Sequence, residues 1–199
     1  MRETEGNAGR TSTREVILAA ASELFDLQGV QSVTTRQIAE RVGISQPSIY
    51  AHFSSMQEIQ DEVSARAFSL LEEATAAEGG DPQAQLLRAI RGYFDFGLGH
   101  PEAYRIAFMM DHPGVETAES KEFASLDHPG PRAFARFASI MARVRPDLAP
   151  EALELRTQSL WACLHGLVAL MIARPEFPWA DRERLVAEHS RLAMRLALA

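Results

Sequence analysis

The sequence predicts an all-α fold. Apolar residues recur at the helical period almost throughout the 199 residues, and no stretch alternates apolar and polar residues over the length of a strand. Residues typical of helix starts and stops separate the periodic segments. At 46% hydrophobic residues, the chain has the composition of a soluble globular protein with a substantial core.

The first predicted helix spans residues 13–28. Ser12 and Glu15 have the spacing of a capping box, and Gly29 follows as a stop. Its predicted apolar face consists of Val16, Ile17, Ala20, Ala21, Leu24 and Phe25. Residues 1–11 are polar and charged and lack the apolar segment of a signal peptide, so we expect a disordered arm.

Two short helices, 35–42 and 46–52, come next. Thr34 and Gln37 again have capping-box spacing, and Gly43 stands where a left-handed residue ends a helix. This helix, glycine turn and helix have the spacing of a helix-turn-helix. We expect an inner face of Ile38, Ala39, Val42, Ile44, Ile49 and Phe53.

The second of these helices exposes polar groups at its beginning. Ser45 is a candidate cap, and Pro47 is tolerated in a first turn, whose amides have no intrahelical partner. We name its outward side chains the reading tip, made of Gln46, Pro47, Ser48, Tyr50 and Ala51. In such a motif a glutamine can pair with adenine in the major groove, and tyrosine or histidine, here Tyr50 and His52, suits phosphate. The alternative, an ordinary helical hairpin with a polar surface, stays open on spacing alone.

A larger helical body follows, which gives predicted domains at 12–60 and 61–199. Asp81 and Pro82 can begin one of its helices, and the proline- and glycine-bearing segment 111–130 is the expected loop. The predicted helices of the body are 56–77, 82–98, 99–110, 131–144, 150–173 and 180–198.

Charge and cysteine content limit the class of protein. The formal net charge of −7 argues against a protein that coats nucleic acid through bulk basicity. The single cysteine, Cys163, permits no internal disulfide, and we expect a cytoplasmic protein. No apolar run approaches the roughly 20 residues that span a bilayer, so no membrane partner is expected.

The segment 12–53, STREVILAAASELFDLQGVQSVTTRQIAERVGISQPSIYAHF, resembles the DNA-binding domain of the TetR (tetracycline repressor-like) family. The similarity extends to about residue 60 and includes Arg14 with ILAAASELF, TTRQIAERVGIS and SIYAHF. It implies phosphate contacts from Thr35, Tyr50 and His52, a base contact from Arg36, and specificity-setting positions at Gln46, Pro47 and Ser48. Met56 stands where the family usually has a phosphate-binding lysine, so we expect either weaker DNA binding or greater dependence on Arg14 and on the arm with Arg2 and Arg10.

The body carries HPEAYRIAFMM and LWACLHGLVALM, which resemble a C-terminal group of this family with a tryptophan followed by His-Gly. This resemblance implies a helical domain that encloses a ligand cavity and dimerises through its last two helices. An excess of leucines independently predicts a two-fold interface between copies. These leucines are Leu153, Leu160, Leu164, Leu167, Leu185, Leu192 and Leu196.

Apolar and aromatic residues at helical spacing supply both a core and any pocket. The candidate pocket residues are Phe94, Tyr104, Phe108, Met109, Phe137, Met141, Trp161 and His165. Trp161 and His165 lie four positions apart on one face. His165 is interpreted either as a ligand-orienting imidazole or as a core histidine bonded to a carbonyl, and Gly166 as a close helix crossing.

No catalytic or metal-binding group emerges. His100, His112 and His128 each precede a proline without metal-ligand spacing, and Cys163 is interpreted as a core residue. No cofactor fingerprint is present. The sequence therefore predicts a non-enzymatic, homodimeric transcriptional regulator, namely a repressor released from a palindromic DNA operator by a small, largely apolar effector. A constitutive DNA-binding or scaffolding dimer and an enzyme are the competing classes.

Overall fold

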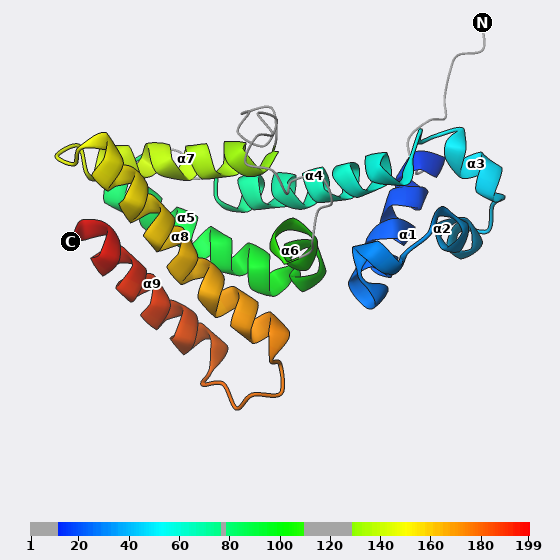
Figure 1. The fold of residues 1–199 in the computed structure, drawn as a ribbon. Coiled ribbons are helices and arrows are strands. Elements are labelled where there is room, and N and C mark those ends of the chain that lie inside the picture. The colour runs from blue at the N-terminus through cyan, green and yellow to red at the C-terminus, as the bar shows by residue number, and fades with distance from the viewer. Residues whose placement is uncertain (1–11, 77–78, 110–128) are drawn as a thin grey trace, which may run out of the picture. The chain divides into compact units, whose positions relative to one another are not determined.

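The computed structural model describes residues 12–76, 79–109 and 129–199, and within these ranges every regular element is a helix (Figure 1). The predicted all-α class is thereby confirmed. The chain forms two compact units, Met1–Val63 and Ser64–Ala199. The elements are α1 Thr13–Gln28, the 3-10 turn η1 Val30–Ser32, α2 Thr35–Val42, α3 Gln46–Tyr50, α4 Met56–Ala74, α5 Pro82–Gly99, α6 Pro101–Phe108, α7 Pro129–Val144, α8 Pro150–Ala173 and α9 Arg182–Leu198.

Three expectations fall wholly or mainly on residues outside these ranges. They are the arm 1–11 with Arg2 and Arg10, most of the loop 111–130, and the histidines His112 and His128.

Helix α1 has the bounds that its capping residues predict. The Ser12 hydroxyl accepts from the Glu15 amide, the Glu15 carboxylate accepts from the Ser12 amide, and Gly29 follows at φ 80°. Its buried residues are Ile17, Leu18, Ala20, Ala21, Leu24 and Phe25. Val16 was expected among them but is 39% exposed, because it lies one step further around the helix than the buried face.

Helices α2 and α3 form the predicted helix-turn-helix. The Thr34–Gln37 capping box is present, and Gly43 adopts the left-handed conformation at φ 79° and ψ 30°. Helix α3 ends at Tyr50 rather than at residue 52, since the His52 amide donates to the Ile49 carbonyl in a tight turn. Of the predicted inner face, Ile38, Ala39, Ile49 and Phe53 are buried, and Val42 and Ile44 are half-buried.

The predicted cap of α3 is wrong. Ser45 makes no side-chain bond to the first amides of the helix. Its hydroxyl lies 2.7 Å from the hydroxyl of Ser48 instead, so the two serines satisfy each other at the surface.

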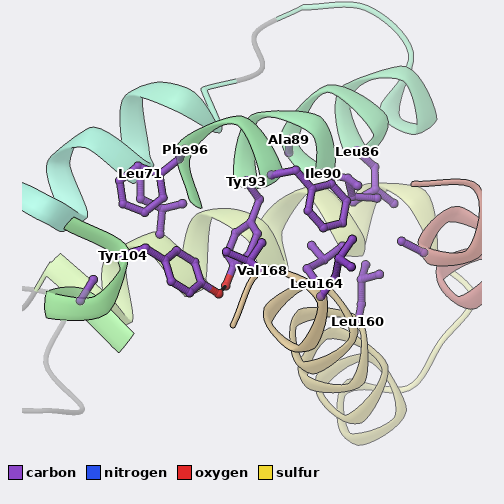
Figure 2. Close-up of a cluster of buried hydrophobic side chains, with 14 of the residues drawn as sticks. Leu71, Leu86, Ala89, Ile90, Tyr93, Phe96, Tyr104, Leu160, Leu164 and Val168 are labelled. Atoms are coloured by element: carbon purple, nitrogen blue, oxygen red, sulfur yellow. Dashed lines mark hydrogen bonds between the residues drawn. The ribbon is translucent and has the colours of Figure 1, made fainter. Parts of the chain in front are cut away.

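Helix α5 is central to the second unit and contacts α6, α7, α8 and α9. Helices α8 and α9 pack side by side in opposite directions (Figure 1). Figure 2 shows the core between α5 and α8, where Ile90 faces Leu160 and Leu164. All three of these side chains are at most 1% exposed, so α8 is a core helix of this unit.

Two glycines of α5 permit close approaches. A Cβ atom on Gly92 would lie 1.9 Å from the Ala74 carbonyl oxygen, at the end of α4. A Cβ atom on Gly97 would lie 2.5 Å from Cγ1 of Val168 and 3.0 Å from the Tyr104 ring. The small residues therefore set how closely α4, α6 and α8 pack on α5.

Five helices of the body have bounds that differ from prediction. Helix α5 ends at Gly99 rather than 98, and α6 spans Pro101–Phe108 rather than 99–110. Helix α4 ends at Ala74 rather than 77, and α9 begins at Arg182 rather than 180. Helix α7 begins at Pro129 rather than 131, because prolines are tolerated in a first helical turn.

The leucines of α8 divide differently from the sequence argument. Leu160, Leu164 and Leu167 are buried inside the unit, so they are not surplus surface. The exposed leucines of α8 are Leu155 and Leu170, at 68% and 55%. Helix α8 is also, among the described helices, the one long and apolar enough to span a membrane by length and composition. Of its apolar window, 33% is buried within the chain.

Candidate nucleic-acid interface and ligand site

The reading tip is held from beneath by one buried side chain. Ile49 is fully buried against α2, which leaves the rest of α3 facing outward. Tyr50 is 52% exposed, Gln46 and Pro47 are exposed, and Ser48 is half-buried. The tip therefore presents an amide and a phenol from a short, anchored helix.

The hydroxyl of Thr35 joins two of these side chains. Thr35 is the first residue of α2 and is only 7% exposed. The Gln46 side-chain amide donates to Thr35 Oγ1 over 3.0 Å, and the Tyr50 phenol oxygen lies 3.3 Å from the same atom. Thr35, expected to contact phosphate, thus lies between two residues of the reading tip.

The two arginines of α2 are paired at the surface. The Nε of Arg36 donates to the Glu40 carboxylate over 2.9 Å, with 77% of the arginine side chain exposed. Arg41 pairs with Glu23 of α1. Exposed pairs of this kind are weak, so a phosphate or base can replace the carboxylate at little cost.

Arg14 is engaged by carboxylates of α4. Its two terminal nitrogens donate to the Glu62 carboxylate, and Nη2 lies 3.5 Å from the Glu58 carboxylate. The guanidinium carbon lies 4.5 Å from the centre of the Phe53 ring. The Glu62 hydrogen bond is the main cause of a raised Arg14 pKa. This Arg14 brace, made of Arg14, Glu58, Glu62 and Phe53, connects α1 to α4. The DNA contact predicted for Arg14 stays a prediction.

Glu58 extends the brace to the start of α4. Its carboxylate accepts from both the amide and the hydroxyl of Ser54 over 2.7 Å, and the hydroxyl bond is the main cause of its lowered pKa. Met56, at the position of the usual lysine, is half-buried. Sequence reasoning missed this network, although Glu58 and Glu62 are four apart on one helical face.

The candidate pocket residues occupy three environments. Phe94, Tyr104 and Met141 are at most 1% exposed and belong to the core. Phe108, Phe137 and His165 are half-buried, while Met109 and Trp161 are 39% and 38% exposed. The set therefore extends from the core to the surface.

A chain of hydrogen bonds connects four of the aromatic residues of the body. Trp161 Nε1 donates to the Tyr93 oxygen over 3.2 Å, the Tyr93 and Tyr104 oxygens are 2.8 Å apart, and the Tyr104 oxygen is 2.7 Å from His165 Nδ1. Figure 2 shows the two phenols pointing at each other from α5 and α6. Tyr93 was not among the predicted residues, because its spacing marks it only as core.

The indole end fixes the direction of the first bond in this Trp161–His165 chain. An indole nitrogen only donates. If Tyr93 donates to Tyr104 and Tyr104 donates to His165 Nδ1, every hydrogen in the chain is used. His165 is then neutral and carries its proton on Nε2. Burial lowers the His165 pKa, which agrees with a neutral ring, and burial raises the pKa of Tyr93 to about 12.

The structural interpretations of His165 and Gly166 made from the sequence are both wrong for this helix face. His165 Nδ1 bonds a phenol rather than a carbonyl. A Cβ atom on Gly166 would have no neighbour within 4 Å, so the expected close helix crossing is not formed within the described part of the chain. Phe108 lies beside the chain, with its ring centre 6.1 Å from that of Trp161 and 5.8 Å from that of His165.

Metal-binding chemistry has no candidate among the residues that the structure describes. No three histidine, cysteine, aspartate or glutamate side chains gather there in a way that could hold an ion. Cys163 is half-buried.

Two family models match the chain. Residues 17–63 match "Bacterial regulatory proteins, tetR family", and residues 86–192 match "Tetracyclin repressor-like, C-terminal domain". The second match alone covers more than half of the chain.

Curated relatives support the same family. The uncharacterized HTH-type transcriptional regulator YobS of Bacillus subtilis is 27% identical over 104 residues, covering 50% of this chain and 53% of YobS. The HTH-type transcriptional activator FasR of Mycolicibacterium smegmatis is 32% identical over 106 residues, covering 52% and 48%. The chain thus spans about half the length of these relatives.

Solved structures share the fold. The TetR family regulator PfmR of Thermus thermophilus superposes with a TM-score of 0.69 at 22% identity, over 90% of this chain and 97% of PfmR. A TetR variant from Acinetobacter baumannii in complex with minocycline gives 0.60 at 20% identity, over 94% and 95%. With both of its units matched, the chain belongs to the TetR family of bacterial regulatory proteins.

Proposed function

We propose that this chain is a sequence-specific DNA-binding transcriptional repressor. The observation that carries the proposal is the exposed α3, whose Gln46 and Tyr50 project from a helix-turn-helix anchored by Ile49. The start of such a helix enters the major groove, where an amide can read adenine. Pro47 and Ser48 would set specificity beside it.

The remaining contacts would fix the protein on the DNA backbone. Tyr50 and His52 are exposed and would bind phosphates, which adds affinity without sequence preference. Arg36 would exchange Glu40 for a base or phosphate. The Arg14 brace would hold the motif in shape, and Arg14 would exchange a carboxylate for a DNA phosphate on binding.

We further propose a homodimer that pairs through α8 and α9. The outer face of α8 supports this, because Leu155 and Leu170 are exposed on it and Gly166 leaves room for a second helix to approach. Leu192 of α9 is likewise 42% exposed. A two-fold dimer would read a palindromic operator with half-sites about 34–36 Å, or a multiple of that distance, apart.

The proposed effector is a small, largely apolar molecule bound near Trp161, His165 and Phe108. Aromatic surroundings with a few oriented polar groups are typical of such sites. The minocycline complex of the TetR variant supports a small-molecule effector in this fold. Release from DNA requires that the effector bind the DNA-free conformation more tightly than the DNA-bound one. A 5- to 150-fold change in operator affinity corresponds to a coupling free energy of roughly 1–3 kcal/mol. Helix α4 would transmit the change.

Activation of transcription is a second candidate. It is favoured by one observation, namely that the relative FasR is described as an activator. Unconditional repression is a third, and the complete burial of Phe94, Tyr104 and Met141 favours it. A reporter gene under the selected operator separates these outcomes. The protein raises expression if it is an activator and lowers it if it is a repressor. An unconditional repressor lowers expression whatever metabolite is added.

Selection from a randomised double-stranded DNA pool tests the central proposal. The full chain is expected to enrich an inverted repeat, and Gln46→Ala to relax it at one base pair per half-site, by about 1–3 kcal/mol. Gln83→Ala, an exposed glutamine at the start of α5, is the matched control. If no sequence is enriched, or if light scattering finds a monomer at micromolar concentration, the proposal is wrong.

Effector binding has its own readout. Trp161 fluorescence is expected to change when fractions of a metabolite extract contain the effector. A fraction that changes the fluorescence and leaves operator affinity unaltered would argue against release by that compound.

A further inference from the structure

The Thr35 hydroxyl is placed to control what the reading tip presents. Gln46 and Tyr50 are four residues apart on α3, so both side chains lie on one face of that helix. Both reach the same oxygen of Thr35, at 3.0 and 3.3 Å. Thr35 itself is only 7% exposed, which limits the access of water to its side of these bonds.

We propose that Thr35 is a positioning residue for specificity, which fixes the Gln46 amide so that it selects adenine. This proposal rests on the proposed DNA-binding function. It differs from the direct phosphate contact that the family resemblance implies for Thr35.

The preference follows from the hydrogens of the amide. A glutamine side chain has two N–H donors and one acceptor oxygen. Thr35 takes one donor, and Gln46 Oε1 has no hydrogen-bond partner among the described residues. One donor and one acceptor remain, which is the complement of adenine N7 and N6 in the major groove. Guanine presents two acceptors there, and the fixed amide can satisfy only one of them.

The same hydroxyl would align the second contact. Thr35 Oγ1 accepts from Gln46, so its own hydrogen is available to the Tyr50 oxygen. The Tyr50 hydrogen is then directed outward, toward a phosphate. The side chains that contact the base and the phosphate are thereby held in their binding positions before DNA is bound. Binding then avoids the conformational entropy cost of ordering a free glutamine.

A binding experiment with four variants of the full chain tests this. The probes are the duplex that wild type selects from a random pool and its single-base-pair substitutions, all at one salt concentration. The variants are Thr35→Val, which keeps the shape and loses the hydroxyl, Thr35→Ser, Gln46→Ala, and the Thr35→Val/Gln46→Ala double substitution.

Thr35→Val is expected to reduce the preference for adenine at the Gln46 base pair by roughly 3- to 10-fold, the value of one neutral hydrogen bond. Thr35→Ser is expected to retain the preference. The double variant is expected to match Gln46→Ala, because Thr35 acts only through Gln46 at that base pair.

Three results would overturn the proposal. Thr35→Val could weaken all duplexes equally, which is the result of a direct phosphate contact. The losses of adenine preference in the two single variants could add up in the double variant. Thr35→Ser could fail to retain the adenine preference. A wild-type chain that enriches no sequence would instead refute the proposed function, and the positioning role with it.

An NMR measurement on the wild-type protein does not depend on whether Thr35 variants fold. The Gln46 side-chain amide is assigned by its loss in Gln46→Ala. Slowed exchange of one of its two hydrogens in the free protein supports the bond to Thr35. Two hydrogens that exchange like those of a solvated glutamine would contradict it.

Discussion

The phenol oxygen of Tyr104 lies 2.7 Å from Nδ1 of His165, and the two rings stack at 21° with their centres 5.6 Å apart. This contact joins a residue of helix α6 to a histidine on α8. The contact connects the buried core to the half-exposed aromatic face around Trp161. Both its geometry and its protonation have measurable consequences.

The stability of the body should depend on pH through His165. Burial lowers its folded pKa below the ordinary 6.5, so between these two values the unfolded chain binds the proton and the folded chain does not. Stability is therefore expected to fall as the pH drops through about 6.5. Thermal melting of wild type and His165→Gln over this range measures it. A wild-type slope that His165→Gln leaves unchanged would contradict the assignment.

Removing the Tyr93 hydroxyl should cost more than one hydrogen bond. In Tyr93→Phe, Trp161 Nε1 loses its acceptor and the buried Tyr104 hydroxyl loses a hydrogen-bond partner. We expect a loss of about 1–3 kcal/mol in the free energy of unfolding, measured by urea denaturation. Tyr50→Phe is the matched control, because that phenol is half exposed and is expected to cost less than about 1 kcal/mol.

Gly92→Ala should be among the most damaging substitutions of the second unit. The new methyl group would meet the Ala74 carbonyl, a backbone atom that cannot rotate away. Overpacking of this kind typically costs about 1–3 kcal/mol. Circular dichroism melting is expected to report a clear loss of thermal stability.

Gly166→Ala is the informative counterpart. No atom lies within 4 Å of its Cβ position, so within one chain the alanine should gain about 0.5–1 kcal/mol of helix propensity. In the proposed dimer, the added methyl group should instead raise the dimer dissociation constant, which sedimentation measures. A substitution that affects neither folding nor dimerisation would argue against α8 as the interface.

The Arg14 brace should stabilise the first unit. Arg14→Gln removes the ion pair with Glu62 and the stacking on Phe53, and we expect a lower melting temperature of the first unit. Arg14→Lys is expected to recover little, because lysine has no planar group to bridge and stack. Arg91→Gln, an exposed arginine of α5, should have little effect on thermal melting. A full recovery with lysine would show that charge alone matters.

Local rules were sufficient for the helices with strong caps. Helices α1 and α2 begin and end where predicted, because a capping box and a glycine mark each of them. The start of α7 was placed too late, since Pro129 and Pro131 look like breakers although a first turn accepts them. Helix α3 was predicted too long because its last turn tightens.

The site was harder to predict, because its connections are between helices. Gln46 and Thr35 were both selected from the sequence, but nothing in their spacing indicates that they bond each other. Tyr93 was overlooked because a buried phenol follows the same apolar period as a phenylalanine. The bonds of Arg14 to Glu58 and Glu62 were overlooked, since these partners are more than forty positions away in the sequence.

The helix pairings also imply an order of folding. In the first unit, α1 packs on α2 and α2 on α3, so its contacts join segments that are neighbours in sequence. In the second unit, α5 depends on α8 and α9, whose residues are made much later by the ribosome. Because local contacts form fast and early segments emerge first, the helix-turn-helix should fold during synthesis while α5 still awaits its partners. For that interval the nascent chain would carry a finished N-terminal unit and an exposed apolar helix, which is a substrate for chaperones.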